Sequence, residues 1–465
     1  MKGGTGAAPG SALAERGGGD PGRSVRKGAF PVNSRLQRRG DRVVAGGRTK
    51  VSHVAAAIAL LACFATRSAH AQARDALPTP LDVQAVVRYV EAHRAEIVAA
   101  LAEARALAQR PTIVGTLPDP MVMVSADHIP FSGMGVDGSI QVQQDFPLSG
   151  VLGARRRAAQ AAADARRLQA GETMLDLTGQ ALQAFHMLAG TRRMATVLDA
   201  QVALAADLTR IATARYAAGA APQSDVLRAD TETRRQSARR AALRGETVAR
   251  EAMLNAALGR AGDLPMPELA AASDEPPAPI EALVAESLRG RPELASVEAT
   301  RRRYRSEVEA MRGMYWPMAF VRAGASTTMS DGPGVMVMVG VSVPIWRARL
   351  AAGVQEARAM GTMADAELRG ARTMIEGEVR SAHGTLEAAR VRTISLRDEV
   401  QPLAVQTLQA TIAAYSAGQT PLVAVIEAAV SLRMTLEEQV MAEVEVGVAR
   451  ARLERAVGRF TEGRR

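Results

Sequence analysis

The chain has 465 residues, with 58 Lys and Arg, 48 Asp and Glu and 47% hydrophobic residues, enough for a sizeable folded core. Residues 1–50 hold eleven basic and three acidic residues, so the other 415 carry only about +2 and no nucleic-acid-binding face is predicted. The residues after the N-terminal leader lack Cys-x-x-Cys, His-Glu-x-x-His and a phosphate-binding Gly loop. We therefore predict no catalytic residues, no metal site and no cofactor, and do not expect an enzyme.

The N-terminal region reads as an export leader. Residues 1–50 are Gly/Arg-rich and are predicted to be a disordered extension, or a mis-called start if translation begins at a valine such as Val43. Residues 51–71 form a signal peptide, with the apolar run "VAAAIALLACFA" and the small-residue site "SAHA" ending at Ala71. Cleavage after Ala71 is predicted. The alternative is lipidation at Cys63 in "LLAC". Both routes take the protein out of the cytoplasm.

The rest of the chain is predicted to be a duplication. "RYAAGAAPQSDVLRAD" and "AYSAGQTPLVAVIEAA" share a Tyr-x-x-Gly-x-x-Pro pattern at an offset of 199 residues. Two proline-bounded extended segments, near 119–147 and 317–344, repeat at an offset of 197 residues. We predict a first repeat over 72–262, a Pro-rich linker over 263–282 and a second repeat over 283–460.

Each repeat contains alternating segments typical of β-strands. In "SIQVQQDF", Ile140, Val142 and Phe146 share one face, and in "VMVMVGVSV" the odd residues from Val335 to Val343 do the same. The pattern alone fits a small soluble sheet or membrane strands, but export and the strand lengths favour four transmembrane strands. Such strands must close across subunits. Three copies, with twelve strands, are favoured over a dimer because twelve leave room for a channel.

The remaining residues predict unusually long helices. Val151 to Arg215 contains no proline, and one helix of that length extends roughly 100 Å. Apolar residues recur every seven positions, which is coiled-coil spacing, and Pro402 is predicted to kink a helix. The heptad positions are Leu168, Leu175, Leu182, Val197, Leu204 and Ile211, with Leu208 between them. The predicted fold class is mainly α with a small β part: a coiled-coil helical barrel with four transmembrane strands per chain.

This order of elements, with the run "RPELASVEA" and the strand ends "DFPLSG" and "VSVPIW", resembles the TolC-like outer-membrane efflux proteins from about Leu81 to Phe460. The resemblance implies a homotrimer with a twelve-stranded β-barrel in outer-membrane lipid and a helical tunnel through the periplasm of a Gram-negative bacterium. It also implies a passive export duct that docks on a periplasmic adaptor and an inner-membrane RND-type pump. The alternatives are a drug-efflux channel, a type I secretion channel, and a periplasmic coiled-coil scaffold without a channel.

Within that family "DPMVMVSADHIPF" and "VSVPIW" look most like the heavy-metal branch of the CusC and CzcC type, which implies heavy-metal cations as cargo. The chain has 20 methionines, and thioethers suit Cu(I) or Ag(I). They include Met121 and Met123, Met336 and Met338, and Met134 beside His128 in the first hairpin loop. Packing remains the stronger interpretation of these residues, since methionine commonly fills irregular sites.

The two Tyr-x-x-Gly-x-x-Pro turns are the candidate functional site. The resemblance implies that they form the periplasmic gate and the tip that meets the adaptor, with a bond from Tyr415 to Asp225 and an acidic ring at Glu427. Thr420 and Ala424 depart from the family, where a gate arginine and a second ring acid stand. The alternative is that both tyrosines only pack the helix ends. The predicted site residues are Tyr216, Gly219, Pro222, Asp225, Tyr415, Gly418, Pro421 and Glu427.

Overall fold

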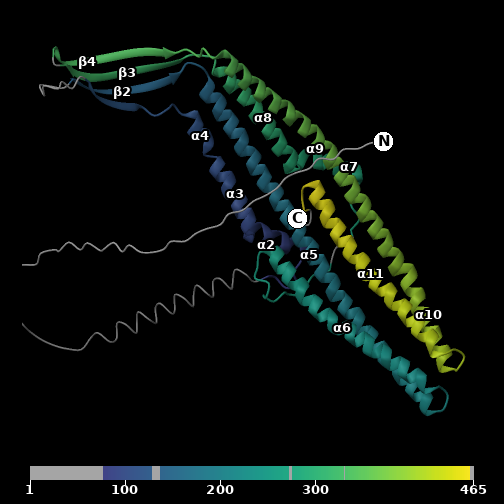
Figure 1. Cartoon of the computed structure of the whole chain (residues 1–465). Coiled ribbons are helices and arrows are strands. Elements are labelled where there is room, and N and C mark those ends of the chain that lie inside the picture. The colour runs from purple at the N-terminus through teal and green to yellow at the C-terminus, as the bar shows by residue number, and fades with distance from the viewer. Residues whose placement is uncertain (1–76, 128–136, 272–274, 329, 461–465) are drawn as a thin grey trace, which may run out of the picture. The chain divides into compact units, whose positions relative to one another are not determined.

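A computed structural model describes residues 77–127, 137–271, 275–328 and 330–460, and the predicted extension and signal peptide lie outside them. One small sheet lies at one end of a set of long helices (Figure 1). The first half contains α2 (Val83–His93), α3 (Ala95–Leu107), α4 (Arg110–Gly115), β1 (Met121–Asp127), β2 (Asp137–Pro147), α5 (Val151–Ala217) and α6 (Gln223–Leu258). The second half contains α7 (Ile280–Gly290), α8 (Pro292–Gly313), β3 (Met318–Thr328), β4 (Gly332–Ser342), α9 (Arg347–Ser395), the π-helical turn η1 (Leu396–Val400), α10 (Gln401–Ser416) and α11 (Leu422–Val457).

Both halves follow the same order of elements. Each places two strands before a long helical run, a tight turn and a helix of 36 residues. The predicted fold class, mainly α with a small β part, is confirmed. The duplication that the repeat indicates stays a prediction. None of the helices in the described ranges is long and apolar enough to cross a membrane.

The long helices form as their composition predicts. Helix α5 runs without a break for 67 residues, because no proline interrupts its backbone hydrogen bonds. Its counterpart is divided by η1, directly before Pro402 in the first turn of α10. Proline has no amide hydrogen to donate, and the helical pattern changes locally beside this residue, where the kink is predicted.

The predicted heptad positions lie along the helix contacts. Leu182 and Leu208 are buried, whereas Leu168, Leu175, Val197, Leu204 and Ile211 are partly buried. Helix α5 contacts both α6 and α11, and α11 contacts α9 and α10. The helices are therefore arranged side by side in the order α6, α5, α11, and α9 with α10 (Figure 1).

Helices α5 and α11 cross at two glycines. A Cβ atom on Gly190 would lie 2.0 Å from a methyl carbon of Val444, and one on Gly447 would lie 2.3 Å from the His186 ring. Real side chains do not approach so closely. Glycine is therefore required at both positions for this separation of the helices.

The linker lies against the first half of the chain. Leu81 and Leu269 form a parallel β-bridge, with the Leu81 amide donating to the Glu268 carbonyl at 2.7 Å. Arg192 of α5 donates to the carbonyl oxygens of Met266 and Pro267, at 3.1 and 2.5 Å. Helix α7 begins at Ile280, so residues 280–282, predicted as linker, are helical.

The four strands form one antiparallel sheet in the order β1-β2-β3-β4, which leaves β1 and β4 as its edges. The register places Val122, Val142, Ala323 and Val337 in one row across the sheet. Because neighbours in a row point to the same side, the two apolar stripes predicted from separate repeats lie on a single face.

That apolar face is open in the chain. Val124 is 77% exposed, Val335 90% and Val337 72%. The opposite face is polar: the Ser125 and Ser139 hydroxyls are hydrogen-bonded at 2.8 Å, and Arg322 Nη2 donates to the Gln143 side-chain oxygen at 2.6 Å. The predicted division into an apolar and a wetter face is confirmed. A small soluble sheet would bury its apolar face against other elements. In the described residues, the apolar face of this sheet is exposed.

Candidate functional site

The two predicted turns join α5 to α6 and α10 to α11, and both lie at the end of the helices opposite the sheet (Figure 1). Gly219 and Gly418 have φ of 70° and 79°, in the left-handed region that glycine adopts without strain. In both turns the residue after the glycine donates its amide to a carbonyl five residues back, Ala220 to Arg215 and Gln419 to Ala414. These are Schellman motifs, which end a helix and reverse the chain.

The prolines precede the returning helices. Pro222 and Pro421 are the N-cap residues of α6 and α11, with ψ near 155°. Their carbonyls accept from the amides of Asp225 and Ala424 at 3.1 Å. Each proline therefore lies one position before the first helical residue.

The structure joins the two turns through Tyr415. Its hydroxyl donates to Asp225 Oδ2 at 3.2 Å, although the two residues are 190 positions apart. Its ring is 1% exposed and packs in a cluster with Leu422 and Val425. Burial, reinforced by the Asp225 carboxylate, raises the pKa of Tyr415. The phenol therefore stays protonated at neutral pH and can act as the donor.

Arg215 is a further member of the site that the sequence analysis missed. Its guanidinium carbon lies 4.5 Å above the centre of the Tyr415 ring, a cation–π contact. Its Nη2 donates to the Ala220 carbonyl at 3.1 Å and lies 3.3 Å from the position of a Cβ on Gly418. Arg215 thus contacts both turns. The sequence offers one signal for it: Arg215 directly precedes Tyr216, whereas the equivalent residue before Tyr415 is Ala414.

The other predicted site residues are placed differently from Tyr415. Tyr216 is 47% exposed and has no side-chain partner among the described residues. Glu427 is exposed on α11 and, within the described ranges, forms no ion pair. The structure therefore brings Tyr415 and Asp225 together with Arg215, and leaves Tyr216 and Glu427 open to solvent.

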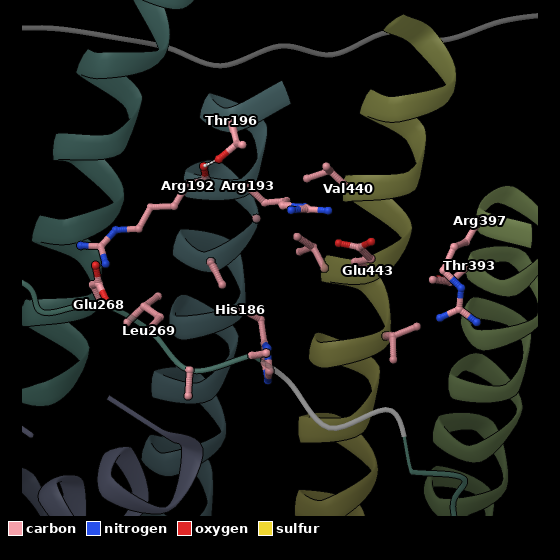
Figure 2. Close-up of a pocket in the computed structure, with 16 residues that line it drawn as sticks. His186, Arg192, Arg193, Thr196, Glu268, Leu269, Thr393, Arg397, Val440 and Glu443 are labelled. Atoms are coloured by element: carbon pink, nitrogen blue, oxygen red, sulfur yellow. Dashed lines mark hydrogen bonds between the residues drawn. The ribbon is translucent and has the colours of Figure 1, made fainter. Parts of the chain in front are cut away.

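A separate groove lies where α5, α11, η1 and the linker meet. It has a volume of about 620 Å³, and its lining includes His186, Arg193, Glu268, Arg397 and Glu443. Figure 2 shows His186 on α5 beside the linker, with Glu443 on the facing α11. Burial, and secondarily Arg450, lowers the pKa of His186 to about 4. At neutral pH this imidazole is uncharged and buried.

The other two described histidines, His93 and His383, lie on helices. The His93 ring stacks on Tyr89 at 4.2 Å and its Nδ1 lies 3.0 Å from the Tyr89 carbonyl oxygen. His383 is half-buried on α9. His128 and Met134 lie outside the described residues. Among the described residues, no group of three or more His, Cys, Asp or Glu is arranged to hold a metal ion.

Comparisons with known proteins agree on one family. The model of the family described as "Outer membrane efflux protein" matches residues 283–459. The outer membrane efflux protein BepC of Brucella suis biovar 1 (strain 1330) is 27% identical over 290 residues, which cover 61% of this chain. The match spans 63% of the length of BepC.

Solved structures share the fold at low identity. The outer-membrane channel OprN has a TM-score of 0.70 at 18% identity, covering 81% of this chain and 89% of its own. CusC has a TM-score of 0.71 at 14% identity, covering 81% and 92%. Since the two likenesses are equally strong, the heavy-metal branch stays a prediction.

The family match over the second repeat, the BepC relative and the common fold point to the same conclusion. The relatives and solved structures are described as outer membrane efflux proteins and outer-membrane channels. The chain is therefore similar to the outer membrane efflux proteins, over residues 283–459 for the family model and over 290 residues for BepC.

Proposed function

We propose that this chain is the outer-membrane channel of a tripartite efflux system, a passive duct that docks on a periplasmic adaptor and an inner-membrane RND-type pump. The observation that carries the proposal is the sheet: one face is apolar and exposed, and among the described residues the outer side of each edge strand has no partner strand. An exposed apolar face suits lipid, but unpaired backbone groups do not. The edges therefore pair with other copies.

Three copies give a twelve-stranded barrel, which is wide enough for a channel, whereas a barrel of eight strands is filled by its own side chains.

The helices also support contact between neighbouring copies. Helix α6 and the run α9 to α10 lie at opposite sides of the helical set, and both expose apolar residues, such as Val248 on α6 and Leu403 on α10. Each copy can thus bury its α6 against α9 and α10 of the next.

As cargo we propose heavy-metal cations. Met121 and Met338 lie in the same row as Gln143 and Arg322, on the polar face of the sheet. In a closed barrel this face lines the channel, so soft thioethers border the path. A duct for such ions needs no resident metal site, because exit requires weak binding.

The first expected result is a trimer. Protein extracted from membranes with detergent is expected to have the protein mass of three mature chains, because four strands cannot satisfy their own edges. Light scattering combined with refractive-index and absorbance detection separates protein mass from bound detergent. A monomer that stays in solution without detergent would contradict the channel, and would favour the periplasmic scaffold.

We further propose that the turns are the periplasmic gate and adaptor tip, with Arg215 added to the predicted residues. Tyr415→Phe removes the hydrogen bond to Asp225, and a bond to a charged acceptor contributes about 1.5 kcal/mol or more. The population of the open state relative to the closed state should therefore rise roughly tenfold. Recordings of single-channel conductance in planar bilayers measure this change. Tyr216→Phe is the matched control, since that exposed hydroxyl has no partner among the described residues. Equal conductance of the parent and Tyr415→Phe would make the turns structural hairpins.

A substitution of Glu427 tests the entrance of the same proposed gate. In a trimer three Glu427 carboxylates surround one axis, so Glu427→Gln is expected to lower cation selectivity and block by multivalent cations. Reversal potentials in a salt gradient measure the selectivity. An unchanged reversal potential would place Glu427 away from the pore.

A further inference from the structure

We propose that the boundary between the sheet and the helices carries a basic band that binds the headgroups of anionic phospholipids. The basic band consists of Arg110, Arg155, Arg156, Arg157, Arg312, Arg347 and Arg349. The inference rests on the proposed function, because it requires the sheet to lie in a membrane. The helices then extend into the periplasm, and the band faces the periplasmic leaflet.

The charge at this boundary is strongly one-sided. The segments that enter and leave the strands, 110–120, 147–157, 309–317 and 344–355, contain those seven arginines and only two acidic residues, Asp119 and Glu309. All seven arginines are exposed. Arg157 forms an ion pair with Glu309 at 2.7 Å, and within the described ranges the other six have no acidic partner. The predicted mature chain as a whole carries little net charge, so the band is a local feature.

Helix stability does not account for the arginines at the starts of α5 and α9. Arg347 is the first residue of α9 and Arg349 the third, and neither α9 nor α5 has an acidic residue in its first turn. The N-terminus of a helix carries a partial positive charge, so cations there are disfavoured. Arg155 to Arg157 follow in the second turn of α5. A negative partner outside the chain would offset this cost.

The band is continuous with the apolar face of the sheet. Val151 and Ala154 of α5 pack against Ala310 of α8, and the Leu148 amide donates to the Pro317 carbonyl at 3.4 Å. Helix α9 also contacts α8. The starts of α5 and α9 and the end of α8 therefore meet directly where the strands begin and end (Figure 1).

Exposed aromatic residues lie at the same boundary between the sheet and the helices. The chain has two tryptophans. Trp316 lies two positions before the start of β3 and Trp346 four positions after the end of β4, and they are 64% and 72% exposed. Arg347 lies beside this pair, with its guanidinium carbon 5.7 Å from the centre of the Tyr315 ring. Tryptophan concentrates at the headgroup level of membranes, so the adjacent guanidinium groups are placed to meet phosphates.

The chemistry of the band selects an anionic lipid. A guanidinium group can donate two parallel hydrogen bonds to one phosphate. Each arginine near an anionic membrane surface contributes on the order of a fivefold preference at low ionic strength. A zwitterionic lipid offers the same phosphate with a neighbouring positive charge, so its net attraction is weaker.

The two tryptophans make the boundary directly measurable. The protein is reconstituted in phosphatidylethanolamine and phosphatidylglycerol vesicles that contain a trace of dansyl-labelled phosphatidylglycerol or dansyl-labelled phosphatidylethanolamine. Energy transfer from tryptophan then reports which lipid is enriched beside the band. We expect several-fold stronger transfer to labelled phosphatidylglycerol, and a loss of that difference near 1 M salt, where charges are screened beyond roughly 3 Å.

Two variants complete the test, and each of them replaces four arginines by glutamine, so both lose the same charge. The band variant combines Arg155→Gln, Arg156→Gln, Arg347→Gln and Arg349→Gln, and is expected to lose the preference. The control variant combines Arg193→Gln, Arg228→Gln, Arg244→Gln and Arg452→Gln, which are exposed on helices away from the sheet, and is expected to keep it. Equal transfer to both labels in inserted parent protein, or equal loss in both variants, would overturn the basic band. Failure of the parent to insert would overturn the proposed function and the band with it.

Discussion

An arginine in place of Val337 is expected to prevent assembly of the proposed membrane-inserted trimer, whereas an arginine in place of the adjacent Met336 is expected to be tolerated. Val337 lies near the middle of β4 on the apolar face and is 72% exposed. A charged side chain at the lipid face costs about 2–4 kcal/mol near the bilayer midplane, and a trimer incurs that cost three times. The total of roughly 6–12 kcal/mol is comparable with the whole free energy of unfolding of a typical protein, about 5–15 kcal/mol.

Met336 is the matched control because it points to the opposite face of the same strand. Its neighbour across the sheet is Gly324, so an arginine there has room and, in the proposed barrel, reaches water. The measurement is the fraction of protein recovered as trimer from the outer-membrane fraction, compared with the parent. Equal recovery of both variants would show that lipid does not contact the apolar face.

The second large effect is a loss of stability between pH 6.5 and about 4 that depends on His186. Burial, and then Arg450, lowers the pKa of this histidine from 6.5 to about 4 in the folded chain. Below pH 6.5 the unfolded chain binds a proton at this residue, but the folded chain does not until about pH 4. Stability therefore falls as the pH falls through this window. The full effect is roughly 3 kcal/mol per chain.

His186→Leu removes this contribution while keeping a buried side chain of similar size. Apparent melting temperatures of the parent should fall more steeply than those of the variant between pH 6.5 and 4, and the two slopes should agree at higher pH. His383→Leu, at a half-buried position on α9, controls for the loss of a histidine as such. Identical slopes for the parent and His186→Leu would show that the imidazole is reached by water in the folded protein.

Local sequence patterns determined the elements of this protein. Alternation with a period of two identified the strands, and the absence of proline over 65 residues identified α5, because both signals depend only on neighbouring residues. The Tyr-x-x-Gly-x-x-Pro patterns located both turns, since a left-handed residue there requires glycine. The resemblance to a family, rather than any spacing, implied the bond between Tyr415 and Asp225.

Contacts between distant segments were decided only by the tertiary structure. The sequence could not show that Val142 and Val337 share one face, because the register of β2, β3 and β4 sets it. Arg215 resembled any other helical arginine until the second turn placed Tyr415 beneath it. His186 is buried because α11 crosses α5 at Gly447. In each case the partner lies far along the chain, where no local period can indicate it, and only packing brings the two groups together.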